Sequence, residues 1–310
     1  MKRVLLAIVL SCGGIGLGSY PFVANYIAER NGSQAIAVYD ETLADLDPDA
    51  LAAAREAAEV YNQTLTGQPV HDPFIAGTGM ALTDDYWQAL GVSGIMGYIE
   101  IPKLGLRLPI YHGTSEAVLL KGIGHLEGTT LPIGGLSRHS VLTGHTGLSS
   151  AKLFTDLVEL QVGDQFYLHV LGETLAYAVD KVEVVEPSQV LKLGRVEGKD
   201  YVTLLTCTPY GINSHRLLVR GERVDYDPNQ RATISKAPGS IDRKVLVATG
   251  ITAVAMFGLI IAVFLVKRRR DESTSTPASD PRLSQDEPPS GPSPGSIPAS
   301  ARVVTSPLTQ

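Results

Sequence analysis

Hydrophobic and polar positions divide the chain into two apolar ends and a mixed centre. An uncharged stretch covers residues 4–28, directly after Lys2 and Arg3. A second covers residues 245–266 and is followed by the cationic run 267–270. At about 1.5 Å per residue, a helix over the second stretch is long enough for the roughly 30 Å hydrocarbon core of a bilayer. Both stretches are therefore predicted to be membrane helices, with a cleaved signal peptide as the alternative for the first.

The charges that flank the apolar segments predict an orientation in the membrane. Because positive residues stay on the cytoplasmic side, the run 267–270 is placed in the cytoplasm, and residues from about 29 to 242 are exported. Residues 271–310 are rich in Ser, Pro, Thr and Gly and lack Phe, Tyr and Trp, which is typical of a disordered tail. The predicted location is the cell membrane, with the central domain extracellular and both termini cytoplasmic if the first segment is uncleaved.

Between the apolar ends, short alternating runs predict a mainly β domain. One helix is expected over residues 47–62, where Asp47 is a natural N-cap and Pro48 suits the first turn. From residue 94 onward, Gly and Pro separate short runs of β character. The predicted strands are 98–101, 106–111, 165–171, 175–185, 201–207 and 216–224. Many short strands and few helices favour a closed or nearly closed β-barrel.

Composition and charge mainly exclude classes of function. The 310 residues carry a net charge of −6 without a basic stripe, so nucleic acid is not an expected partner. The sequence has no His-Glu-x-x-His pair, EF-hand loop or phosphate-binding glycine loop, so no metal and no cofactor are expected. The two cysteines, Cys12 and Cys207, cannot form a disulfide scaffold.

Cys207 is the only cysteine of the predicted exported domain, since Cys12 lies in the first apolar segment. Such a thiol is catalytic, bonded to another chain, or inert and buried. It ends the predicted strand 201–207, and Arg216 opens the next one. If the two strands pair antiparallel, Cys207 and Arg216 lie side by side at one rim. There the cation would favour the thiolate and could stabilise an oxyanion.

A cysteine nucleophile also needs an acid and base, because a free thiol is mostly protonated near pH 7. The seven histidines are His71, His112, His125, His139, His145, His169 and His215. His145 is the leading candidate, because glycines on both sides allow a tight turn that exposes its imidazole at a strand end. His125, also between glycines, is the second candidate, and His169 inside an alternating strand is expected to be structural.

The run TLLTC that ends at Cys207 resembles the TLxTC signature of sortases, the cysteine transpeptidases of Gram-positive cell surfaces. The run LTGH that ends at His145 resembles the histidine segment of that family, and Arg216 stands in the place of its essential arginine. The resemblance covers about residues 94–224. It implies an eight-stranded β-barrel with Cys207 as nucleophile, His145 as acid and base, and Arg216 as the group that positions substrate and stabilises the oxyanion.

Two further features resemble the class C, pilus-assembly branch of the sortases. One is the second membrane segment, and the other is Asp72-Pro73-Phe74, which is similar to the lid motif of that branch. Asp72 could accept hydrogen bonds from Arg216, and Phe74 could shield the Cys207 sulfur. The alternative is an ordinary Asp-Pro turn with a half-buried ring.

The resemblance implies a sorting signal of the LPxTG type, cleaved between Thr and Gly through a thioester acyl-enzyme. In the pilus branch a pilin lysine resolves the thioester, so the expected partners are pilin subunits with a sorting signal and an acceptor lysine, and the membrane. Three alternatives are a housekeeping sortase that uses a cell-wall precursor, a secreted cysteine peptidase, and an anchored adhesive module with an inert cysteine.

The predicted fold is mainly β: an eight-stranded sortase-type β-barrel, preceded by a helical and lid segment and flanked by transmembrane helices. The six predicted parts are residues 1–28 (membrane anchor or signal segment), 29–93 (helical region with the lid loop), 94–230 (catalytic barrel), 231–244 (linker), 245–266 (transmembrane helix) and 267–310 (cytoplasmic tail).

Overall fold

The computed structural model describes residues 2–65, 67, 70–75, 82–228, 250, 257–258, 260–261 and 263–269. The chain divides into two units, Met1–Thr252 and Ala253–Gln310. In the second unit the described residues are helical. The predicted linker 231–244 and the tail beyond residue 270 lie outside the described residues, as does most of the predicted membrane segment 245–266.

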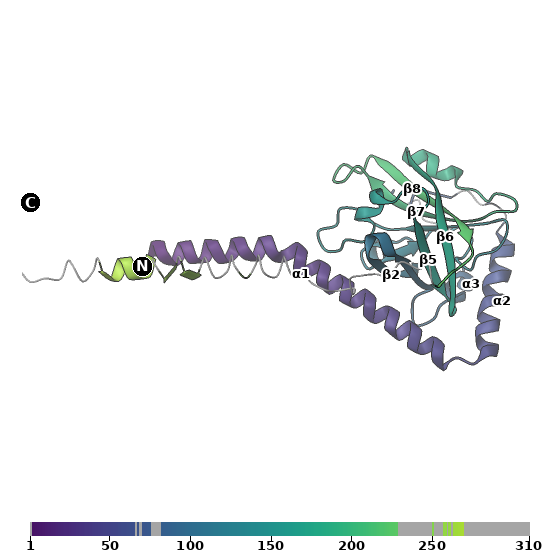
Figure 1. Ribbon diagram of the computed structural model, residues 1–310, viewed down its shortest axis with the longest axis horizontal. Coiled ribbons are helices and arrows are strands. Elements are labelled where there is room, and N and C mark those ends of the chain that lie inside the picture. The colour runs from purple at the N-terminus through teal and green to yellow at the C-terminus, as the bar shows by residue number, and fades with distance from the viewer. Residues whose placement is uncertain are drawn as a thin grey trace, which may run out of the picture. The chain divides into compact units, whose positions relative to one another are not determined.

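Eight strands of the first unit form a closed barrel (Figure 1). They are β1 (Gly97–Ile101), β2 (Leu106–His112), β3 (Ile123–His125), β4 (Arg138–Thr143), β5 (Gln165–Val170), β6 (Glu173–Val185), β7 (Asp200–Thr208) and β8 (His215–Val224). Around the barrel the order is β1-β2-β3-β4-β7-β8-β6-β5. The pairs β2–β3 and β4–β7 are parallel, and the other neighbours are antiparallel. The predicted eight-stranded barrel is confirmed.

All six strands predicted from the alternating pattern are present, whereas β3 and β4 were not among them. β3 is only three residues long and contains Gly124, which is a poor strand former. The glycine is required there, because a Cβ would lie 2.3 Å from the carbonyl oxygen of Gly113. The strand therefore depends on close packing against β2, which a local pattern does not reveal.

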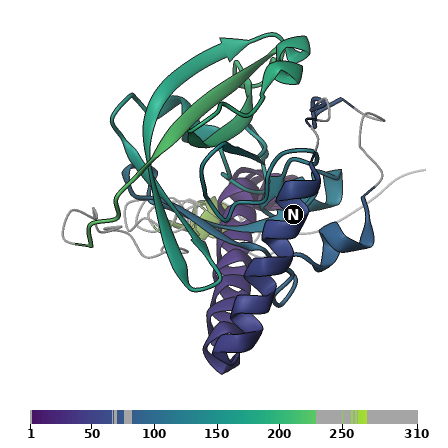
Figure 2. The same cartoon turned by 90° about the vertical axis from the view of Figure 1, so that its right-hand side faces the viewer.

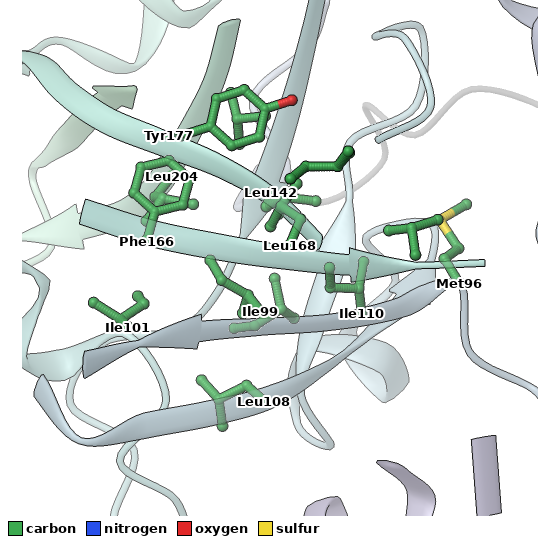
Figure 3. Packing of buried hydrophobic residues seen from close by; sticks show 14 of the residues in the cluster. Met96, Ile99, Ile101, Leu108, Ile110, Leu142, Phe166, Leu168, Tyr177 and Leu204 are labelled. Atoms are coloured by element: carbon green, nitrogen blue, oxygen red, sulfur yellow. The ribbon is translucent and has the colours of Figure 1, made fainter. Parts of the chain in front are cut away.

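Apolar side chains from alternate strand positions fill the barrel interior (Figure 3). Members of this cluster include Ile99, Ile110, Leu142, Phe166, Leu168, Tyr177 and Leu204. A second, smaller cluster contains Val141, Leu205 and Leu218, whose strand neighbours belong to the interior cluster. These three side chains therefore point outward from β4, β7 and β8. Val70 and Phe74 pack over them, and this covered outer face positions the site described below.

The helices before the barrel are α1 (Lys2–Asp45), α2 (Pro48–Thr64) and α3 (Asp84–Gln88), and α4 (Glu116–Leu119) follows β2. Figure 2 shows the first two, in purple and blue, outside the barrel. The predicted helix over residues 47–62 is confirmed as α2. As expected, Asp47 caps it, accepting a hydrogen bond from the backbone N–H of Ala50 at 2.7 Å.

Helix α1 is continuous from Lys2 to Asp45, so the boundary expected after residue 28 falls inside it. Its last turns pack on the barrel, where Tyr39 is buried and its hydroxyl accepts a hydrogen bond from the N–H of Leu171 at 2.9 Å. Within the described part of the chain, no helix combines the length and the apolar character of a membrane span. The two membrane helices stay predictions.

Candidate active site

Cys207 lies near the end of β7 and pairs directly with Arg216 at the start of β8. The predicted side-by-side placement of the two residues is confirmed. Neighbouring strand residues point to opposite faces, and both Leu204 and Leu217 point into the barrel. Cys207 and Arg216 therefore face outward, over the covered face of β7 and β8.

His145 reaches the same rim from another strand. The parallel strands β4 and β7 pair Thr143 with Leu205. His145 and Cys207 each follow these partners by two residues, so both leave the sheet at the same end. Together with Arg216 they line one cavity of about 840 Å³. The structure thus brings the three candidate catalytic residues together.

Gly144, the residue before His145, allows the backbone of this segment to pass close to Ile123 and Phe154. A Cβ at Gly144 would lie 2.7 Å from the Cδ1 atom of Ile123 and 2.8 Å from the Cδ2 atom of Phe154. The Gly144 carbonyl also accepts a hydrogen bond from the hydroxyl of Thr206 at 2.7 Å. This bond ties the histidine segment to β7, because Thr206 belongs to that strand.

Residues 70–75, called the lid segment from here on, hold Arg216 through Asp72. The Nε of Arg216 donates to both carboxylate oxygens of Asp72, at 3.1 and 2.9 Å. Both residues are buried, with 5% of Arg216 and 2% of Asp72 exposed. The Nη1 of Arg216 also donates to the carbonyls of Asn213 and His215, each at 3.0 Å. The guanidinium is therefore fixed by its own hairpin on one side and by the lid segment on the other.

Phe74 covers the site from the same segment. Its ring centroid lies 5.4 Å from that of His145 and 5.2 Å from the Cζ atom of Arg216. Pro73 and Phe74 both line the cavity that contains Cys207. The backbone N–H of Phe74 donates to Asp72 at 3.0 Å, an Asx-type turn that fixes the ring relative to the carboxylate.

The electrostatics of the closed site favour neutral reacting groups. Burial raises the pKa of Cys207 to about 11, Arg216 lowers it and Asp72 raises it further. Burial also lowers the pKa of His145, against the opposing effect of Glu116. As expected, Arg216 favours the thiolate by lowering the pKa of Cys207, but burial outweighs this effect and Asp72 opposes it.

The other two histidines considered lie elsewhere. His125 is fully buried, and its Nε2 donates to the carbonyl of Thr130 at 2.9 Å, so its Nδ1 accepts from the hydroxyl of Tyr86 at 3.0 Å. Burial lowers its pKa to about 4, and it does not line the cavity. His169 lies on β5, with its Nε2 3.4 Å from a carboxylate oxygen of buried Glu100.

The cavity wall around Glu127 contains polar residues that the sequence did not single out. Glu127 is only 5% exposed, and both its oxygens accept hydrogen bonds from Thr114, one from the backbone N–H at 2.9 Å and one from the hydroxyl at 2.7 Å. The Nε2 of His71 lies 3.7 Å from the same carboxylate. For His71, the sequence offered one indication of a place in the site, namely its position next to Asp72. Glu127 lies two residues after His125, but only pairing of β2 with β3 brings it to the wall.

In the part of the chain that the structure describes, no group of three or more His, Cys, Asp and Glu side chains could hold a metal ion. The residues that line the cavity suit chemistry carried by the thiol, the imidazole and the guanidinium themselves.

A family model described as "Sortase domain" matches residues 99–224. Sortase A of Bacillus anthracis is 32% identical over 130 residues, which cover 42% of this chain and 60% of that relative. Sortase D of Bacillus subtilis (strain 168) is 30% identical over 131 residues, covering 41% of this chain and 63% of the relative. The matched segment thus spans less than two thirds of either curated relative.

Solved structures of sortase C proteins match over more of their length. The structure of sortase C-1 from Streptococcus pneumoniae is 48% identical, with a TM-score of 0.60, covering 63% of this chain and 100% of that one. Sortase C1 of Streptococcus agalactiae is 43% identical, with a TM-score of 0.59, covering 63% and 97%. The pilus-related sortase C of Group B Streptococcus is 42% identical, with a TM-score of 0.58, covering 61% and 97%.

Proposed function

We propose that this chain, which belongs to the sortase family, is a membrane-anchored cysteine transpeptidase. It cleaves an LPxTG-type sorting signal between Thr and Gly and joins the Thr carbonyl to the side-chain amine of a pilin lysine. One observation carries the proposal: Cys207, His145 and Arg216 converge on a cavity that the lid segment closes.

In the first half-reaction, Cys207 and His145 act as a nucleophile and its base. Neutral His145 takes the thiol proton, and the thiolate attacks the Thr carbonyl carbon of the sorting signal. As the C–N bond to Gly breaks, His145 gives that proton to the departing amine. A thioester to Cys207 remains. Arg216, placed beside Cys207 by strand pairing, stabilises the negative charge on the carbonyl oxygen of the tetrahedral intermediate.

The lid segment keeps the enzyme inactive until substrate arrives. In the closed arrangement Asp72 engages Arg216, which is then not available to a substrate oxygen. Phe74 covers the imidazole, and the raised pKa of Cys207 leaves the thiol protonated. Opening of the segment removes the carboxylate and admits water and substrate, and both changes lower the pKa of the thiol.

In the second half-reaction an amine resolves the thioester. Identities of 42–48% to the sortase C structures, together with the lid contacts, support a pilin lysine as the acceptor. The matches to Sortase A support a second candidate, in which a cell-wall precursor supplies the amine. A location at the cell membrane, with the barrel outside, would keep the enzyme beside membrane-held precursors and raise their effective concentration.

The products of one reaction distinguish these functions. We would incubate the full-length chain with a sorting-signal peptide, a pilin and a glycine-type amine, and identify the products by mass spectrometry. The proposal predicts a Thr–lysine isopeptide bond that is absent with Cys207→Ala. Hydrolysed peptide alone would indicate a peptidase. Transfer only to a glycine-type cell-wall amine would indicate the housekeeping alternative.

A further inference from the structure

The cavity wall around Glu127 carries a fixed negative charge in the same cavity as the catalytic residues. The carboxylate of Glu127 is nearly buried, and two hydrogen bonds from Thr114 set its orientation. A buried carboxylate is costly unless charged or hydrogen-bonding partners compensate it. The two bonds from Thr114 come from neutral donors, so a cation beside the carboxylate would compensate its charge further.

In the closed structure a lid residue faces this carboxylate. His71 is 9% exposed, and its Nε2 lies 3.7 Å from Glu127, which is too long for a hydrogen bond. Neither ring nitrogen of His71 has a hydrogen-bond partner among the described residues. The imidazole is therefore held there by the lid segment rather than by polar bonds of its own. When the segment opens, His71 leaves and the carboxylate faces the open cavity.

Apolar side chains contribute to the lining of the same cavity. Leu82, Trp87 and Leu119 line it together with Glu127 and Cys207. The four-carbon stem of a lysine packs on surfaces of this kind while its charged end reaches a polar group. The wall thus offers an apolar path for the stem and a carboxylate for the ammonium.

We propose that Glu127 binds the ε-ammonium of the acceptor lysine, and that His71 occupies this place while the lid segment is closed. The proposal rests on the proposed function and identifies the acceptor side of the same cavity. Glu127 takes one proton from the ammonium, and the neutral amine attacks the thioester carbonyl. The C–N bond forms as the C–S bond breaks. A second proton passes from nitrogen through His145 to the Cys207 sulfur, and Glu127 releases its proton to solvent.

The test separates lysine transfer from the other steps of the reaction. Full-length chains would all carry Asp72→Ala, which removes the contact between the lid segment and Arg216, and would be compared with and without Glu127→Gln. An LPxTG-type peptide is the donor, and Nα-acetyl-lysine amide or hydroxylamine is the acceptor. Hydroxylamine is neutral near pH 7 and needs no carboxylate. Glu173→Gln, on a different cavity of the barrel, is the matched charge control.

We expect Glu127→Gln to lower the rate of transfer to the lysine amide by about tenfold or more, because a hydrogen bond to a charged group is lost. Acyl-enzyme formation and transfer to hydroxylamine should stay within about twofold of the parent, as should every rate with Glu173→Gln. Thr114→Val keeps the charge but loosens the carboxylate, and should give a smaller, lysine-specific loss. This variant decides the matter if Glu127→Gln fails to fold.

Two results would overturn the proposal. One is lysine transfer by Glu127→Gln within about twofold of the parent, and the other is an equal loss with lysine and with hydroxylamine. If the parent chain forms no acyl-enzyme at all, the proposed function fails and this inference fails with it. An intact acyl-enzyme with unselective transfer would refute the role of Glu127 alone.

Discussion

Two arginines on the same face of β8 each engage a carboxylate through Nε, and Arg220 adds a bond from Nη2 to Asp180 at 2.5 Å. The Nε of Arg216 donates to both oxygens of Asp72 at 3.1 and 2.9 Å, and the Nε of Arg220 donates to both oxygens of Asp180 at 3.0 and 3.2 Å. The partners come from different places. Asp180 lies in β6, which pairs with β8, whereas Asp72 lies in the lid segment, 144 residues before Arg216.

An aromatic ring accompanies each guanidinium as well. The Cζ atom of Arg220 lies 4.1 Å from the ring centroid of Tyr201, a residue of β7. The Cζ atom of Arg216 lies 5.2 Å from the ring of Phe74, again a residue of the lid segment. The same two interactions therefore occur once within the barrel and once between the barrel and the lid segment.

Under the proposed function, one kind of interaction serves stability in the barrel and control in the lid segment. The pairing of β6 with β8 keeps Asp180 beside Arg220, whereas movement of a short segment would take Asp72 away from Arg216. The side chain of Arg216 is only 6% exposed, against 28% for Arg220. An unpaired buried cation is costly, so water or a substrate group must replace Asp72 as it leaves. The proposed function therefore predicts that substrate binding favours lid opening.

The largest expected effect contrasts the two arginines directly. Arg216→Ala should lower the rate of sorting-peptide cleavage by roughly 100-fold or more, since it removes a group that stabilises the oxyanion. Arg220→Ala should stay within about threefold in this rate and lower Tm instead. Cleavage kinetics and thermal unfolding of both variants measure this. Similar losses of activity in both would show that Arg216 has no special role.

The next effect contrasts the two carboxylates through the reactivity of the thiol. Asp72→Ala should move the pKa of Cys207 down from about 11, because a negative charge is removed and water enters. Each unit of decrease gives about tenfold more thiolate at any pH below the pKa. The rate of iodoacetamide labelling against pH reports the midpoint. Asp180→Ala should leave that midpoint unchanged. An unchanged midpoint in Asp72→Ala would contradict the proposed effect of the lid segment on Cys207.

A smaller effect is expected from the aromatic rings. Phe74→Ala should increase labelling of Cys207 by roughly two- to fivefold, because it opens the cavity while Asp72 still engages Arg216. Tyr201→Ala should leave labelling as it is and lower Tm, since its ring belongs to the barrel. Equal labelling of the wild-type chain and Phe74→Ala would mean that residues 72–74 form only a turn.

The smallest effect is expected from residues 271–310, which include no member of the two arginine–carboxylate pairs. Deletion of residues 271–310 should leave turnover of a sorting peptide in solution within about twofold of the full chain, because this composition does not form a packed site. Steady-state kinetics of both proteins test this. A large loss would show that the tail takes part in the reaction.

The sequence predicted the hairpin geometry of the site but not its charge state. Cys207 and Arg216 stand at facing strand ends, so their pairing followed from an antiparallel connection alone. The raised pKa of Cys207 did not, because burial depends on the lid segment packing over the outer face. Local sequence patterns do not predict such packing. They indicated only that Arg216 favours the thiolate, an effect on the pKa of Cys207 that burial outweighs.

The cavity wall around Glu127 also could not be predicted from local patterns, because it depends on long-range contacts. His71 and Glu127 meet only because the lid segment crosses the barrel and β3 pairs in parallel with β2. Gly124 weakens the strand signal of β3, so neither the strand nor its contribution to the cavity could be read from alternation. His125 has glycines near it in the sequence, as His145 does, but its role is structural. Both of its ring nitrogens form hydrogen bonds inside the protein.

The central claim is that Cys207 forms a thioester in a cavity that the lid segment closes. Mass spectrometry of the full-length Asp72→Ala chain after incubation with an LPxTG-type peptide tests it most directly. We expect an adduct that ends at the Thr of the peptide, is released by hydroxylamine and maps to Cys207. No adduct, or an adduct that persists in the Asp72→Ala, Cys207→Ala double variant, would contradict it.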